Sequence, residues 1–89
     1  MKILIDLQES VLHTNTLITD AMSYYEENSD EFKILNHSLL TGNTMQIALK
    51  EALEVTLKQD LSAKKKINVM ALIKATETWC NETKGALGN

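Results

Sequence analysis

Two histidines and one cysteine are the residues of this sequence with the greatest potential for metal or nucleophilic chemistry. His13, His37 and Cys80 lie far apart, and none belongs to a His-x-x-x-His, Cys-x-x-Cys or His-Glu-x-x-His spacing. Metal sites therefore have no support in the sequence. A nucleophilic cysteine would need a nearby base, and the sequence does not locate one for Cys80. We therefore expect no metal, no cofactor and no enzymatic activity, and we interpret Cys80 as a small buried apolar residue beside Trp79.

Four carboxylates cluster at Glu26, Glu27, Asp30 and Glu31. Such a group can bind calcium, but the order Asp-x-Asn-x-Asp-Gly of the EF-hand loop is missing. Acidic side chains also favour the positive N-terminal end of a helix. The cluster therefore predicts a junction between two helices.

The only basic run of the chain is Lys64, Lys65 and Lys66. If a helix started at Ser62, these lysines would lie in its first turn, close to the positive end of the helix dipole. Each would then destabilise the helix by a few tenths to about 1 kcal/mol. We therefore predict that the preceding helix continues to about Lys66, where they complement its negative end. A helix that continues unbroken through residues 44–84 is the alternative, and contact of the lysines with an anionic ligand or an acidic partner is a second interpretation of their role.

Nucleic-acid binding has little support in the charge pattern. Residues 1–60 carry ten acids and four lysines, whereas residues 61–89 carry two acids and five lysines, and the formal net charge of the whole chain is −3. There is no arginine to form bidentate contacts with phosphates or guanine edges. The attraction to phosphate should accordingly be weak.

The elements that position these residues are predicted to be helices of a single domain, residues 1–89. The chain has no proline and three glycines, two of them near its C-terminus, so few residues interrupt a helix. No apolar run approaches the roughly 18 residues of a membrane span, and the apolar part of MKILIDLQ is too short for a signal peptide. We expect a cytoplasmic protein without a membrane segment.

Apolar periodicity predicts an all-α fold of three or four antiparallel helices in a small bundle, at about residues 3–27, 30–41, 44–66 and 69–84. The long first helix has one apolar stripe, Asn28 or Ser29 caps the second, and Gly42 ends it. The expected stripe of the first helix consists of Ile3, Leu4, Leu7, Val11, Ile18, Ala21, Met22 and Tyr25.

More apolar residues are present than one stripe per helix requires. Ile5 and Leu12 lie on the face of the first helix opposite its apolar stripe. On the third helix the apolar positions, Val55 among them, span an arc of roughly 200°, and Ile47 lies outside even this arc. A second apolar face indicates contact with another chain. We predict partner or oligomer contacts at Ile5, Leu12, Tyr24, Ile47 and Val55.

These patterns favour a non-catalytic helical protein–protein interaction module, a homo-oligomer that acts as a small regulator or inhibitor of another protein. The alternative is a sponge or sensor for an anionic, nucleotide-like ligand at a pocket between subunits. Lys64, Lys65 and Lys66 would then meet the anion, and Tyr24 or Trp79 would stack on a base. A nucleic-acid accessory protein is the weakest alternative.

Overall fold

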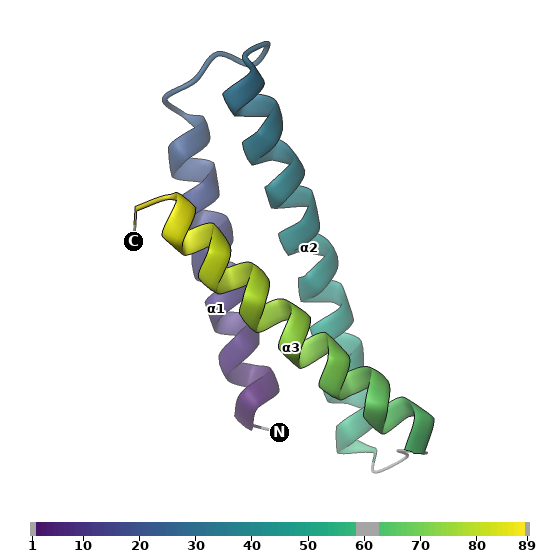
Figure 1. The fold of residues 1–89 in the computed structure, drawn as a ribbon. Helices are drawn as coiled ribbons and strands as arrows, with labels where there is room; N and C mark the ends of the chain where they lie inside the picture. The colour runs from purple at the N-terminus through teal and green to yellow at the C-terminus, as the bar shows by residue number, and fades with distance from the viewer. Residues whose placement is uncertain (1, 59–62, 89) are drawn as a thin grey trace.

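The computed structural model describes residues 2–58 and 63–88. Within these ranges the chain forms three α-helices and no strand: α1 (Lys2–Met22), α2 (Asp30–Leu57) and α3 (Ala63–Ala86). Helices α1 and α2 form an antiparallel hairpin, and α3 crosses one side of it while running back toward the connection between them (Figure 1). The predicted all-α bundle is confirmed, and its shape is elongated, with extents of 46 × 22 × 16 Å.

The core lies where α3 crosses the hairpin. Its buried residues are Leu4, Leu7, Val11, Leu49, Ala52 and Cys80, with Leu53, Val69, Leu72, Ile73 and Trp79 packed around them. Four of the eight residues of the predicted α1 stripe are buried, namely Leu4, Leu7, Val11 and Ile18, and Ala21 and Met22 are half-buried. The predicted burial of Cys80 is confirmed. Ile3 and Tyr25 were also predicted to be buried, and both are exposed. Ile3 lies at the edge of the stripe, and Tyr25 lies beyond the end of α1.

Two buried threonines interrupt the apolar core without an unpaired hydroxyl. The Thr14 Oγ1 atom donates a hydrogen bond of 2.8 Å to the Ser10 carbonyl, and Thr76 Oγ1 donates one of 2.7 Å to the Leu72 carbonyl. Both side chains are fully buried. Because each hydroxyl bonds to its own helix, the cost of burying an unpaired polar group is avoided.

The first helix ends earlier than the predicted residue 27. Beyond Met22 the backbone N–H groups of Ser23, Tyr24 and Tyr25 donate to carbonyls three residues back, which tightens the chain into turns. The Ser23 hydroxyl also donates to the Asp20 carbonyl, at 2.6 Å. These local bonds compete with the α-helical pattern and end it.

The start of α2 is as predicted, but its end is not. Ser29 caps the helix, and its Oγ atom accepts a hydrogen bond of 3.1 Å from the Phe32 N–H. The predicted break at Gly42 is wrong, because α2 continues to Leu57. Gly42 is buried where side chains of α1 and α3 converge on it, so its lack of a Cβ permits close helix packing and does not serve to end a helix.

The predicted boundaries of the last two helices, at 66 and 69, are also wrong. Helix α2 ends at Leu57, and α3 begins at Ala63, so Lys64, Lys65 and Lys66 belong to its first turn. The dipole cost of such a start is a few tenths to about 1 kcal/mol per lysine. Packing of α3 against the core opposes that cost, and packing generally contributes more to helix stability than end charges do.

Within residues 2–58 and 63–88, no helix combines the length and the apolar character needed to cross a bilayer.

Candidate functional site

The predicted contact residues on α1 share one exposed face. Ile5 and Leu12 are 44% and 60% exposed, and they lie seven residues apart, which brings them to the same side of the helix after two turns. The buried side chains of Leu4, Leu7 and Val11 occupy a different side. The two exposed residues therefore form an apolar row along α1, which we call the α1 row.

A similar row lies on α2. Ile47 is 62% exposed, and Leu40, seven residues earlier, is 57% exposed. We call this pair the α2 row. Leu40 was not among the predicted contact residues, because the predicted helix of residues 30–41 ended before Gly42 and so did not connect Leu40 with Ile47. The seven-residue spacing from Ile47 would have identified it once α2 was known to be continuous.

Side-chain hydrogen bonds indicate how the two rows are aligned along the bundle. The Gln46 Nε2 atom donates to the Gln8 carbonyl at 3.4 Å, so Gln46 lies level with Gln8. Ile47 follows Gln46 directly, and Gln8 lies between Ile5 and Leu12 in the sequence. The α2 row thus reaches the same height on the bundle as the α1 row.

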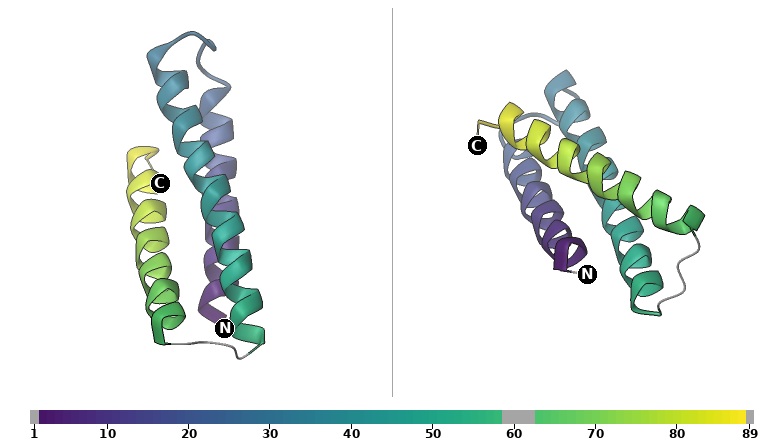
Figure 2. Two further views of the ribbon diagram at one scale, coloured as in Figure 1. Left: turned by 90° about the vertical axis from the view of Figure 1, so that its right-hand side faces the viewer. Right: turned by 60° about the horizontal axis from the view of Figure 1, so that its bottom comes forward.

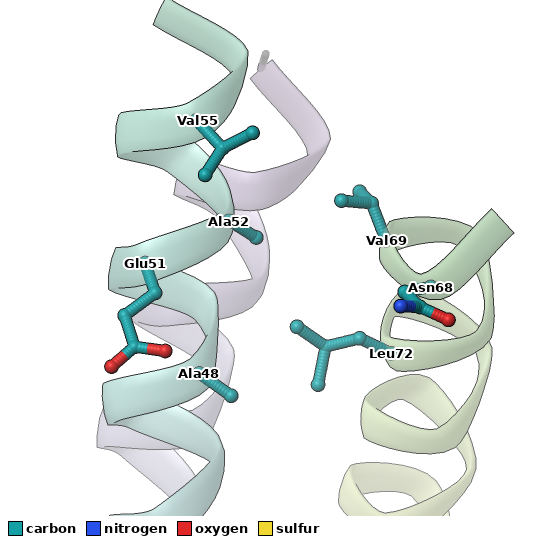
Figure 3. A pocket seen from close by; sticks show the side chains of 7 residues that line it. All are labelled: Ala48, Glu51, Ala52, Val55, Asn68, Val69 and Leu72. Atoms are coloured by element: carbon teal, nitrogen blue, oxygen red, sulfur yellow. The ribbon is translucent and has the colours of Figure 1, made fainter. Parts of the chain in front are cut away.

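Val55 lies in a different place, in an open groove between α2 and α3. The groove has a volume of about 410 Å³. In Figure 3 the side chains of Ala48, Ala52 and Val55 face those of Val69 and Leu72 across it, whereas Glu51 points away from α3. Its lining is mostly apolar, with one carboxylate and one amide: Ala48, Glu51, Ala52, Val55, Asn68, Val69 and Leu72. The groove exists because Ala48 and Ala52 are too short to fill the space in front of Val69 and Leu72.

Tyr24 is the most exposed of the predicted contact residues. It is 84% exposed and lies in the connection after α1, far along the bundle from the start of α3 (Figure 1). A second residue of the nucleotide hypothesis, Trp79, packs against the core. Lys64, Lys65 and Lys66 lie in the first turn of α3, but their side chains fall outside the part of the chain that the structure describes. A pocket that combines these lysines with Tyr24 would require two copies of the chain.

The residues with potential for metal or nucleophilic chemistry are not brought together. His13 and His37 are exposed on α1 and α2, while Cys80 is buried. Among the described residues, no group of three or more histidine, cysteine, aspartate or glutamate side chains has a geometry that could hold a metal ion.

No family model matches this chain, and no curated protein or solved structure shows significant similarity to it.

Proposed function

We propose that this chain is a non-catalytic helical interaction module that associates with further copies of itself and acts as a small regulator or inhibitor of another protein. The observation that carries the proposal is the presence of two apolar rows, the α1 row and the α2 row, at one height on the bundle. Single exposed apolar residues are common in monomeric proteins. In each row two large aliphatic side chains lie seven residues apart, a spacing that brings them to one side of the helix, where they can pack against another helix.

The magnitude of the burial supports association. Fully burying an aliphatic side chain contributes about 1.5–3 kcal/mol. Ile5, Leu12, Leu40 and Ile47 are about half exposed, so covering all four in one copy gives roughly 3–6 kcal/mol. A symmetric dimer whose interface covers both rows gains this twice, which is comparable with the cost of losing translational and rotational freedom, about 4–15 kcal/mol.

The groove between α2 and α3 is a second place for a partner. Its apolar walls and its length along two helices suit an apolar side chain from another helix. Val55 contributes to association through this groove in the proposed arrangement, whereas Leu12 and Ile47 act through the rows.

Sedimentation equilibrium of single variants tests the proposal. Leu12→Glu and Ile47→Glu each place a charge within a row, and each should weaken self-association by about tenfold or more. His13→Glu and His37→Glu are matched controls, because they add the same charge at exposed polar positions of the same helices. An unchanged subunit count in both row variants would reject the rows as contact surfaces.

A further inference from the structure

Helix α3 does not reach the end of the hairpin that carries the connection between α1 and α2. It ends at Ala86, and the left view of Figure 2 shows the hairpin continuing well beyond it. Apolar side chains remain uncovered in this region: Ile34 is 67% exposed, and Tyr25 is also exposed. The hairpin end therefore has an apolar surface that its own third helix leaves open.

Two adjoining hollows lie on this surface. Their volumes are about 420 and 250 Å³, and they share Ala21, Tyr25, Ala86 and Leu87. We treat them as one surface, the hairpin-end hollow, centred on these four residues. It extends over Tyr24 on one side and over Ile34 on the other.

The charged residues that line the hairpin-end hollow are all acidic. Asp20 lines the larger hollow and Glu31 the smaller. Residues 20–31 carry five acids and no lysine, arginine or histidine. This surface repels phosphate groups and anionic lipids, and it attracts cations.

We propose that the hairpin-end hollow binds a basic amphipathic helix of a partner protein. The proposal rests on the proposed function and names the chemistry of the partner. The apolar face of the incoming helix would cover Ile34 and Leu87, and its lysine or arginine side chains would meet Asp20 and Glu31. Tyr24 and Tyr25 add ring faces on which a cationic side chain can stack. The incoming helix would occupy the layer that α3 leaves empty.

Fluorescence anisotropy with two synthetic helical peptides tests this proposal on the full chain. Both peptides are about 18 residues long, or about five turns, and have the same leucine face. One carries lysine and the other glutamate on the polar face. The lysine peptide should bind, with an affinity that falls as salt is added, and the glutamate peptide should bind at least about tenfold more weakly. Equal binding of the two peptides would overturn the proposal.

Variants distinguish the hollow from a general effect of net charge. Asp20→Lys should weaken binding of the lysine peptide by about tenfold, and the new lysine lies near the C-terminal end of α1, where a cation favours the helix. Glu9→Lys is the matched control, with the same change of charge on an exposed position of the same helix, and it should change the affinity by less than about twofold. Equal loss in both variants would overturn the proposal.

A third variant and a second readout complete the test. Ile34→Ser replaces an exposed apolar side chain without changing the charge. It should weaken binding of the lysine peptide by about fivefold or more, and an unchanged affinity would overturn the proposal. Asp20→Lys should leave the subunit count unchanged in sedimentation, whereas a lower count would show that a second copy fills the hollow and would overturn the choice of partner. Monomers that bind the peptide would refute only self-association, and oligomers that do not bind it would refute only the hollow.

Discussion

The indole ring of Trp79 on α3 lies against the backbone of Gly42 on α2, so closely that a Cβ atom on Gly42 would be 2.7 Å from the Trp79 Cη2 atom. The same Cβ would be 2.9 Å from the Asn15 Cγ atom of α1. Three helices therefore meet at a position where only hydrogen fits. This contact links the packing of α3 to the α1–α2 hairpin.

Replacing Gly42 should destabilise the protein despite the better helix propensity of alanine. In an open helix, Gly→Ala is favourable by about 0.5–1 kcal/mol. At Gly42 the added methyl meets a ring and an amide, and overpacking of this kind costs about 1–3 kcal/mol. Gly42→Ala should therefore lower the free energy of unfolding by roughly 1–2 kcal/mol in a urea titration followed by circular dichroism.

Gly85 provides the matched control for Gly42. It lies in α3, and a Cβ built on it has no neighbour within 4 Å. Gly85→Ala should therefore leave stability unchanged or raise it by up to about 1 kcal/mol. Equal effects of the two substitutions would contradict the close approach at Gly42.

Asn15 and Gly42 should be energetically coupled. The Asn15 Oδ1 atom is buried and has no hydrogen-bond partner within the described residues, and it is among the atoms nearest to the position of a Gly42 Cβ. Asn15→Ala removes this side-chain amide and makes room for the methyl group of an alanine at position 42. In the double variant, Gly42→Ala should cost about 0.5–2 kcal/mol less than in the wild-type background, as measured by a double-mutant cycle. Strict additivity would assign the crowding to Trp79 alone.

Loss of the cap on α2 should weaken the hairpin. The Ser29 hydroxyl accepts the Phe32 N–H at 3.1 Å and donates to the Glu26 carbonyl at 2.7 Å. Ser29→Ala should therefore lower the free energy of unfolding by about 0.5–2 kcal/mol. Asn28→Ala, one residue earlier and exposed, should change it by less than about 0.5 kcal/mol. If Asn28→Ala lowered the free energy of unfolding more than Ser29→Ala does, the cap would be Asn28 and the assignment to Ser29 would be wrong.

Filling the groove between α2 and α3 should stabilise the fold. Ala48 lines the groove and is partly exposed, so a leucine there can extend toward Leu72 without displacing a buried side chain. Ala48→Leu should raise the midpoint of thermal unfolding, by an amount equivalent to about 0.5–1.5 kcal/mol. Ala71→Leu, at an exposed position of α3, is the control and should have little effect. A loss of stability in Ala48→Leu would mean that the groove is already closed.

The parts of the fold that depend on local chemistry were predictable from the sequence. The apolar periodicity of α1 identified Leu4, Leu7, Val11 and Ile18 as core residues, and the serine and acids after Asn28 located the start of α2. These features depend on side chains within a few residues of one another, so one sequence contains them. The exposure of Ile5, Leu12 and Ile47 also followed from their positions on a helical wheel.

The features that depend on packing between distant segments were not predictable. The residues around Gly42 in the sequence are the same whether this glycine ends a helix or makes room for a tryptophan of another helix. Only the packing of α3, which brings Trp79 against Gly42, distinguishes the two roles. The lysine run was assigned to the wrong helix because end charges contribute less than packing of the residues that follow. The hairpin-end hollow depends on where α3 ends relative to Ile34, a distance that no pattern in the sequence encodes.

Sedimentation equilibrium of the wild-type protein over a wide range of concentrations, with Leu12→Glu beside it, tests self-association through the apolar rows most directly. We expect a mass of at least two chains that falls toward one chain on dilution, and a lower mass for Leu12→Glu at every concentration. A single-chain mass for the wild-type protein at all concentrations would contradict the proposed homo-oligomer.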